Sequence, residues 1–188
     1  MLAPFWIVVM QKTKLQTLLS GMTVVKQWVD KLLSLILIVI VGTMTALVTY
    51  QVASRYLFNS PSAVSEVLSR YLFIWLILFG SAYVFGLREH MAISFIKDKF
   101  KAKYRLCAEM FIELVTASFA YAIMITGGYN SALRQMWQLD SALQIPMGVI
   151  YSAIPISGAL ILFYFIYNEL NLVNQFKSLK HSSTAGEV

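Results

Sequence analysis

Charged side chains are scarce in this chain of 188 residues. Asp, Glu, Lys and Arg together make up 13% of the sequence, whereas hydrophobic residues make up 59%. Soluble domains carry about 25% charged residues, and the mean hydropathy of this chain is +0.69. So many apolar residues argue against a disordered protein. A chain this short also has too little interior to hide its apolar surface from water, which argues against a soluble enzyme. The composition therefore predicts a membrane protein.

Cysteine and histidine, which supply many metal, haem and redox sites, are almost absent. Cys107 is the only cysteine, which excludes an internal disulfide and a Cys-x-x-Cys motif. A membrane haem protein needs axial histidines inside its spans, but His90 and His181 lie outside the long apolar runs. The sequence shows no nucleophile beside a base and no phosphate-binding loop. We therefore expect no cofactor, no metal site and no catalytic residue, and we do not expect an enzyme.

Four long runs contain no Asp, Glu, Lys, Arg or His. They are residues 32–54, 71–87, 114–133 and 141–168. About 20 apolar residues span a bilayer as a helix, and a helix satisfies its own backbone hydrogen bonds in lipid. The sequence therefore predicts an all-α integral membrane protein with four transmembrane helices, at about 32–54, 61–87, 109–133 and 146–168.

Local signals mark the ends of these helices. Ser60 followed by Pro61 is typical of an N-cap and a first helical residue, so we begin the second helix at Pro61. Pro146 and Pro155 interrupt the last run, which predicts a helix that begins near Pro146 and kinks near Pro155. Gly127 and Gly128 are expected to loosen the third helix near its outer end.

Two cytoplasmic segments, 1–31 and 169–188, are expected to flank the membrane domain 32–168. In the first, apolar residues recur at helical spacing while lysines fall mostly off that stripe, which is typical of an amphipathic helix in the membrane surface. The stripe consists of Leu15, Leu18, Leu19, Met22, Val25 and Trp28. Residues 1–10 lack the basic start and the cleavage site of a signal peptide. A similar pattern over 93–104 predicts a second amphipathic segment on the inner leaflet.

Lysine and arginine are unevenly divided between the two sides of the predicted membrane domain. Twelve lie before the first helix, between the second and third, or after the fourth, whereas Arg55, Arg70 and Arg134 lie on the other side. The positive-inside rule then places both termini in the cytoplasm. The net charge of +6 therefore reflects membrane orientation. We expect membrane phospholipids, and no nucleic acid, as partners.

The segment between the first two helices, residues 51–70, contains the main candidate site. Glu66 and Arg70 are four residues apart, in the order that favours an ion pair on a helix. Arg55 approaches from the end of the first helix. Charges near a bilayer are costly unless paired, so we interpret the three residues as an ion cluster at a subunit interface or docking surface. Two alternatives stay open: snorkelling arginines beside a solvated glutamate, and a substrate site.

A second charged stripe leads into the third helix. Arg105, Glu109 and Glu113 recur every four residues. A carboxylate deep inside a span could drive proton-coupled export. Glu113 lies at the edge of its apolar run, so we favour an interfacial ladder that balances nearby lysines.

Small residues at helical spacing predict close contacts between the helices. Gly42 and Ala46 are four residues apart in the first helix, as are Gly148 and Ser152 in the fourth, and Gly80 begins a Gly-Ser-Ala stretch in the second. Such spacing lets helix backbones approach closely in lipid.

Several short motifs together carry a family resemblance. In order they are Gln51-Val52-x-x-Arg55-Tyr56-x-Phe58-Asn59-Ser60-Pro61, Ser65-Glu66, Arg70-Tyr71-Leu72-Phe73-x-Trp75, Gly80, Arg88-Glu89-His90-Met91, Ile145-Pro146-Met147 and Tyr151-Ser-Ala-Ile-Pro155. By their order, spacing and four-helix setting, residues 30–168 resemble the small membrane subunit of tripartite ATP-independent periplasmic (TRAP) transporters, the DctQ-like family.

The resemblance implies a place in the bacterial inner membrane, beside a large membrane transport subunit. A periplasmic substrate-binding protein would deliver an organic acid, and a sodium gradient would drive its import. The large subunit would move the substrate while this chain stays with the static scaffold and binds neither substrate nor ion. The sialic-acid branch is the most similar overall, and C4-dicarboxylates and other small acids stay open.

The resemblance also implies roles for individual residues. Arg55, Glu66 and Arg70 would lie near the large-subunit interface or a docking surface. Trp75 would pack within the membrane interface, Glu89 and His90 would close the inner end of the second helix, and Gly80 and Pro155 would serve helix packing.

Two other functions compete with this interpretation. The first is an autonomous four-helix exporter that acts as a homodimer, which needs a carboxylate deep in a span. The second is a haem-carrying membrane anchor of a redox enzyme, which needs histidines inside the spans.

Overall fold

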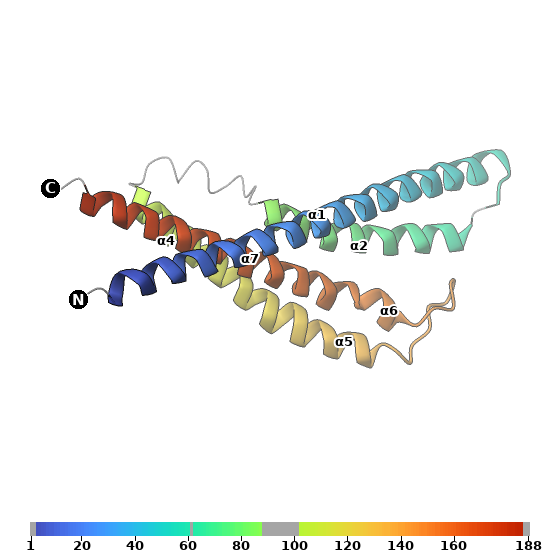
Figure 1. The fold of residues 1–188 in the computed structure, drawn as a ribbon. Helices are drawn as coiled ribbons and strands as arrows, with labels where there is room; N and C mark the ends of the chain where they lie inside the picture. Colours follow the sequence, from blue (N-terminus) through green and yellow to red (C-terminus); the bar gives the residue numbers. More distant parts are fainter. Residues whose placement is uncertain (1–2, 61, 88–101, 186–188) are drawn as a thin grey trace.

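The chain is almost entirely helical in a computed structural model that describes residues 3–60, 62–87 and 102–185 (Figure 1). Its helices are α1 (Ala3–Leu57), α2 (Ala63–Leu87), α4 (Ala102–Phe119), the π-helix η1 (Ala120–Gly127), α5 (Gly128–Arg134), α6 (Met147–Tyr151) and α7 (Ala153–Ala185). Side chains are described for residues 20–60, 62–87 and 108–173. An isolated bridge between Leu139 and Pro146 is the one β-type pairing in these ranges. The predicted all-α class is confirmed.

Four helical segments are long and apolar enough to cross a membrane. They are Ser20–Leu57, Ala63–Leu87, Ala108–Arg134 and Met147–Val173. Only 11% to 33% of each apolar window is buried inside the chain, so most of its surface is left for lipid or another membrane protein. The four predicted transmembrane helices are confirmed.

The helices pack mainly as neighbours in a row. α1 packs along α2, α2 along α7, and α7 along the continuous α4, η1 and α5. α1 also contacts α7. Figure 1 shows that α1 begins and α7 ends at the same end of the molecule, which we call the terminal end. The α1–α2 and α5–α6 connections lie at the opposite end, which we call the loop end.

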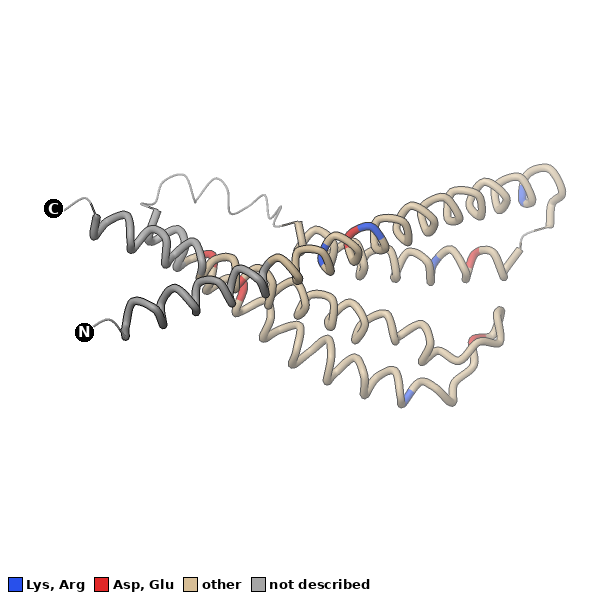
Figure 2. The backbone as a smooth tube through the Cα atoms, viewed as in Figure 1, with Lys and Arg blue, Asp and Glu red and all other residues tan. Residues whose placement is uncertain are grey.

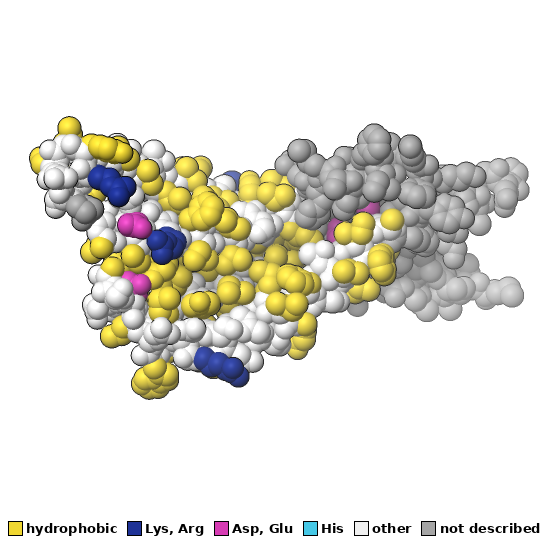
Figure 3. Space-filling view, turned by 180° about the vertical axis from the view of Figure 1, so that it is seen from behind, with side chains coloured by type: hydrophobic (Ala, Val, Ile, Leu, Met, Phe, Trp, Pro, Cys, Tyr) yellow, Lys and Arg dark blue, Asp and Glu magenta, His cyan; other side chains and the backbone are white. Residues whose placement is uncertain are grey.

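The core lies where α1, α2, η1 and α7 meet. Its fully or nearly buried members are Leu33, Phe79, Ala82, Phe85, Ala120, Met124, Ile161 and Tyr164. Trp75 packs against this cluster and contacts Phe79 edge to face, with 5.2 Å between ring centroids. The remaining surface is largely apolar, and Figure 3 shows hydrophobic side chains over much of one described face.

The N-terminal segment is helical, as predicted, but no break separates it from the first span. α1 runs through 55 residues without interruption. Side chains before Ser20 lie outside the described part, so the placement of this segment in the membrane surface stays a prediction. The amphipathic pattern over 93–104 falls mostly outside the described residues.

The predicted N-cap at Ser60 is wrong, because Ser60 hydrogen-bonds back to the last turn of α1, which ends at Leu57. The Ser60 amide donates to the carbonyl of Ser54 at 3.2 Å, and the Ser60 carbonyl accepts from the Ser54 hydroxyl. Asn59 between them takes the left-handed conformation, with φ 49°, that commonly ends a helix. Ser62 caps α2 instead, since its hydroxyl oxygen accepts from the Ser65 amide at 3.5 Å.

The third span is irregular near the predicted glycine pair, but most of the irregular segment precedes it. Residues 120–127 form the π-helix, whereas Gly127 and Gly128 have ordinary helical φ values of −67° and −63°. Gly128 serves close packing, because a Cβ added there would lie 2.8 Å from Ile154 and 3.1 Å from Pro155. The irregularity therefore begins at Ala120, seven residues before the glycine pair, and ends at Gly127.

The fourth span breaks near Pro155, as expected. α6 ends at Tyr151 and α7 begins at Ala153, with Ser152 between them in a turn. Pro155 has no amide hydrogen, so the carbonyl of Tyr151 four residues earlier has no intrahelical donor, and the break falls at that point.

Predicted contacts at small residues are only partly present. A Cβ added at Gly148 would clash with the carbonyl oxygen of Ala132 and lie 2.7 Å from the sulfur of Met136, so α6 and α5 meet closely there. A Cβ added at Gly42 or Gly80 would meet nothing within 4 Å, so these glycines make no close contact within the described part of the chain, and their role in helix packing stays a prediction. The sequence pattern missed Gly86 and Gly158, which approach Tyr164 and Met124.

Candidate functional site

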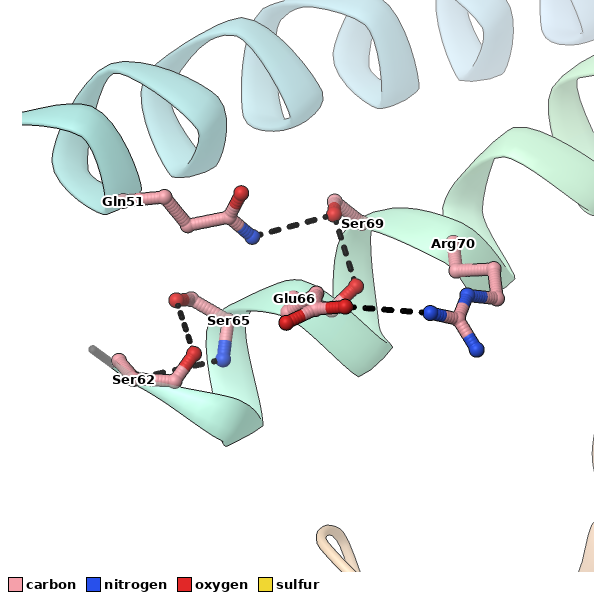
Figure 4. A network of polar contacts seen from close by, with 6 residues as sticks. All are labelled: Gln51, Ser62, Ser65, Glu66, Ser69 and Arg70. Carbon is pink, nitrogen blue, oxygen red and sulfur yellow. Dashed lines mark hydrogen bonds and ion pairs between the residues drawn. The ribbon is translucent and has the colours of Figure 1, made fainter. Parts of the chain in front are cut away.

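Glu66 and Arg70 form an ion pair at the loop end. Arg70 Nη2 lies 3.2 Å from Glu66 Oε1. The side chain of Arg70 is 65% exposed, and that of Glu66 is 67% exposed. Because they are one helical turn apart at the start of α2, the pair forms without any other element (Figure 4). An exposed pair of this kind adds little to stability, so it is available to a partner.

Arg55 stands apart from this pair, so the predicted three-residue cluster is wrong for the isolated chain. It is exposed in the last turn of α1, and the described residues give it no ion-pair partner. Helical phase explains this. Gln51 and Ser54 occupy the side of α1 that meets α2, and the side chain at position 55 points about 100° away from that at position 54.

Uncharged polar residues join α1 to α2 next to the pair. The Gln51 amide donates to the hydroxyl of Ser69 at 3.3 Å, and Ser69 donates to the carbonyl of Glu66 at 2.9 Å (Figure 4). Ser65 is buried and donates to the carbonyl of Ser62 at 3.0 Å. The sequence did not indicate the hydrogen-bonding roles of these serines, because their spacing resembles that of ordinary loop and cap residues.

A second polar contact ties α2 to the loop 135–146. The Tyr71 hydroxyl donates to Asp140 Oδ2 and lies 3.4 Å from the sulfur of Met147. The other carboxylate oxygen of Asp140 accepts from the amides of Ala142 and Leu143, each at 2.9 Å. Donation by Tyr71 first, and then by the backbone amides, lowers the pKa of Asp140 below its ordinary value.

The loop 135–146 is further ordered by its backbone. The Asp140 amide donates to the carbonyl of Ile145 at 3.0 Å, and the amide of Met147 donates to the carbonyl of Gln138 at 2.8 Å. Gln144 has a positive φ of 54°, which lets the chain turn back toward α6. The connection therefore presents a fixed surface at the loop end.

A separate polar cluster joins α1 to α7 toward the terminal end. Asp30 accepts from Lys26 Nζ at 2.7 Å and from the Tyr164 hydroxyl at 2.6 Å. The Lys26 ammonium also lies 5.6 Å and 5.7 Å from the ring centroids of Tyr164 and Tyr167. Thr23 shares a 3.3 Å hydrogen bond with the Tyr167 hydroxyl. Figure 2 shows this group of charges separated along the helices from those near the loop end.

Glu113 lies inside the protein, which corrects its predicted place in an interfacial ladder. Its side chain is 7% exposed and lies within the span Ala108–Arg134. The sequence pattern placed Glu113 at an edge because its apolar run starts one residue later, but the helix and its packing extend further. Asn168 of α7 is also buried, and its side-chain nitrogen has no acceptor among the described residues.

The remaining predicted site residues have different positions. Trp75 is half-buried against the core, and Gly80 faces open space. Pro155 lies against Gly128. Glu89 and His90 lie outside the described residues. Within the part of the chain that is described, no group of three His, Cys, Asp or Glu side chains could hold a metal ion.

A family model and the similar curated proteins all point to the same family. The DctQ component of the tripartite ATP-independent periplasmic transporters matches residues 44–175. The sialic acid TRAP transporter small permease protein SiaQ of Vibrio cholerae is 26% identical over 156 residues, which cover 83% of this chain and 90% of that protein. A putative TRAP transporter small permease protein of Haemophilus influenzae is 28% identical over 134 residues, covering 71% and 83%.

One further relative has a different length. The sialic acid TRAP transporter permease protein SiaT of Haemophilus influenzae is 27% identical over 116 residues. This match covers 62% of the present chain but only 19% of SiaT. A region similar to this chain is therefore a minor part of a much longer permease.

Proposed function

Since this chain belongs to the DctQ component family of the TRAP transporters, we propose that it is a scaffold subunit that binds and stabilises a large membrane transport subunit. The family consists of transporter components and is not a class of enzymes. The four apolar spans and the family together place the chain in the bacterial inner membrane. In the proposal, the large subunit moves the substrate and this chain binds neither substrate nor coupling ion.

The observation that carries this proposal is the match to SiaT. There, a region similar to this chain is continuous with a permease of about five times its length, since it makes up 19% of that protein. A covalent link holds two parts at a high effective concentration, which suits parts that work together. We infer that the present chain makes the same association as a separate subunit.

The surface of the chain supports an association within the membrane. Large apolar side chains are exposed along α1, including Leu35 and Ile38 at 58% and 69%. Gly42 lies on the same side of α1, beside open space. A face with a small residue among large ones accepts a neighbouring helix closely. The large subunit would cover part of this apolar surface, and lipid would cover the rest.

The loop end supplies the proposed polar part of the interface. Arg55 is exposed without an ion-pair partner among the described residues, and the Glu66–Arg70 pair is exposed on α2 at the same end of the molecule. We propose that these three side chains contact the large subunit or a periplasmic binding protein that docks transiently. Trp75 would sit at the membrane interface, and Glu89 and His90 would close the inner end of α2.

The transported substrate is proposed from the relatives alone. Two of them, SiaQ and SiaT, are named as sialic acid TRAP transporter proteins. We propose that the complete transporter imports sialic acid or a similar carboxylate, that a periplasmic binding protein delivers it, and that sodium drives the import.

Co-purification tests the proposed association. The chain and the large subunit of the same transporter are co-expressed, with an affinity tag on this chain only. Recovery of the large subunit in a fixed ratio is expected. Recovery of this chain alone, under detergent conditions that keep both proteins folded, would contradict the proposal.

One observation favours a second function, the autonomous exporter that acts as a homodimer. Glu113 is buried inside a span, as a proton-coupled carboxylate would be. The exporter predicts that cells expressing this chain alone gain resistance to a toxic compound, and that Glu113→Gln abolishes it. The scaffold proposal predicts no resistance from either version.

A further inference from the structure

An exposed apolar stripe runs along α5 and ends in an aromatic side chain beyond the helix. Tyr129, Leu133, Met136 and Trp137 are 57%, 48%, 46% and 93% exposed. The spacing of four residues between Tyr129, Leu133 and Trp137 keeps these three on one side of the helix and its following turn, whereas Met136 also packs against Gly148 of α6. The stripe therefore continues the lipid-accessible surface of the third span up to Trp137.

Trp137 lies where a membrane span gives way to polar surroundings. The third span ends at Arg134, and Trp137 follows three residues later in the turn. A tryptophan has an apolar ring system and one N–H donor, which suits the boundary between hydrocarbon and headgroups. A side chain this exposed in a purely aqueous loop would leave a large aromatic surface in water.

Arg134 adds a positive charge at the same level. It is exposed, and the described residues give it no ion-pair partner. The acidic residue of the following loop, Asp140, is already engaged by Tyr71 and by two backbone amides. Arginine at a span end extends its charge toward phosphate groups while its stem stays on apolar surface.

The backbone around Trp137 is held in place. The Met136 amide donates to the carbonyl of Leu133 at 3.3 Å, and the Gln138 amide donates to that of Gln135 at 3.2 Å. The carbonyls of Gln135 and Gln138 also accept from the amides of Gly148 and Met147, at 3.1 Å and 2.8 Å. Since the backbone is already ordered, little backbone entropy is lost when the indole is immobilised.

We propose that Trp137 and Arg134 form an anchor that binds the headgroup region of the phospholipid leaflet at the loop end. The indole lies among the glycerol and carbonyl groups, and the guanidinium contacts lipid phosphate. The anchor fixes the depth of the third span, on the far side of α7 from α1 and α2. This inference requires only that the chain spans a bilayer, so it goes beyond the proposed subunit function and can fail separately from it.

Fluorescence quenching in vesicles tests the anchor. The full chain is reconstituted into vesicles of phosphatidylcholine and phosphatidylglycerol, and the contribution of Trp137 is the difference between the wild type and Trp137→Phe. Nitroxides attached near the lipid headgroup are expected to quench this contribution more than nitroxides near the end of the acyl chain, and more than iodide in the water. Trp75→Phe, which reports an indole packed against the core, provides the comparison.

The arginine is tested with the nitroxide carried on phosphatidylglycerol. Arg134→Gln is expected to lower local enrichment of this anionic lipid about fivefold, which corresponds to ~1 kcal/mol for one arginine at an anionic surface. Quenching by a neutral nitroxide lipid should stay unchanged.

Two results would overturn the anchor. In the first, iodide quenches Trp137 freely and lipid nitroxides do not, which would show an aqueous surface. In the second, the large subunit or the binding protein protects Trp137 from headgroup nitroxides, which would show a protein-docking surface. Both measurements read Trp137 directly and do not depend on transport.

Discussion

The hydroxyl of Tyr164 in α7 donates a 2.6 Å hydrogen bond to the carboxylate of Asp30 in α1, across 134 residues of sequence. The same carboxylate pairs with Lys26. This contact connects the first helix of the chain to the last, and Tyr164 is fully buried beneath it. The Asp30 carboxylate is itself only partly buried, with its side chain 20% exposed, and its two donors offset the cost of that burial.

We predict that Tyr164→Phe destabilises the isolated protein by about 1.5–3 kcal/mol, because a hydrogen bond to a charged group is lost. Unfolding of the purified protein in detergent measures the change. Tyr129→Phe, at an exposed tyrosine, serves as the control and should change stability little. Equal stability of Tyr164→Phe and the wild type would show that the contact is unimportant.

Glycines at helix contacts should tolerate alanine less than glycines beside open space. A Cβ at Gly158 would lie 2.8 Å from the Cβ of Met124, so we expect Gly158→Ala to cost about 1–3 kcal/mol through overpacking. Gly42→Ala meets nothing within 4 Å and should leave the isolated chain as stable or slightly more stable. The same unfolding assay compares the two, and a reversed order would contradict the packing described here.

Acidification should release the loop 135–146 from α2. The pKa of Asp140 is lowered in the folded protein, chiefly by the Tyr71 hydroxyl. Because the pKa of Asp140 is lower in the folded protein than its ordinary value of 3.8, the ionised carboxylate stabilises the folded loop fully at a pH above 3.8. This stabilisation is lost as the pH falls through the pKa that Asp140 has in the folded protein. Hydrogen exchange at the amides of Ala142 and Leu143, corrected for intrinsic rates, should therefore quicken below that pH.

Asp140→Asn provides the control for this pH effect. An asparagine cannot ionise, so amide exchange in the loop should lose its additional pH dependence. If the wild type and the variant had the same corrected pH profile, the carboxylate would not be the group that holds the loop.

Substitutions at the loop end should separate assembly from stability. An exposed pair four residues apart on a helix contributes about 0.3–0.5 kcal/mol, so Glu66→Ala should hardly change the stability of the isolated chain. We predict that Glu66→Ala and Arg55→Ala each lower recovery of the large subunit in co-purification. Arg134→Ala, at an exposed arginine on α5, is the matched control and should leave recovery unchanged. Unaltered recovery with both loop-end variants would remove these residues from the interface.

The fold class could be predicted because its signal is local. Each span contains a long apolar run, so the four helices follow from the order of residues alone. The break in the fourth span follows equally from Pro155, whose missing amide hydrogen acts on a carbonyl only four residues away.

Apart from the close approach at Gly148, contacts between helices could not be predicted, because they depend on helical phase and register. Arg55 and Ser54 are neighbours in sequence, yet only Ser54 is buried. Gly42 and Gly158 look alike in sequence, but only Gly158 approaches another helix closely. Tyr71 and Asp140 are 69 residues apart, and nothing in either segment indicates the other.

We propose that this chain supports transport without carrying it out. Proteoliposomes test it most directly, with this chain alone, the large subunit alone, or both, each given the binding protein, sialic acid and an inward sodium gradient. We predict uptake only when both membrane subunits are present. Sodium-driven uptake by this chain alone would show that it carries the substrate itself.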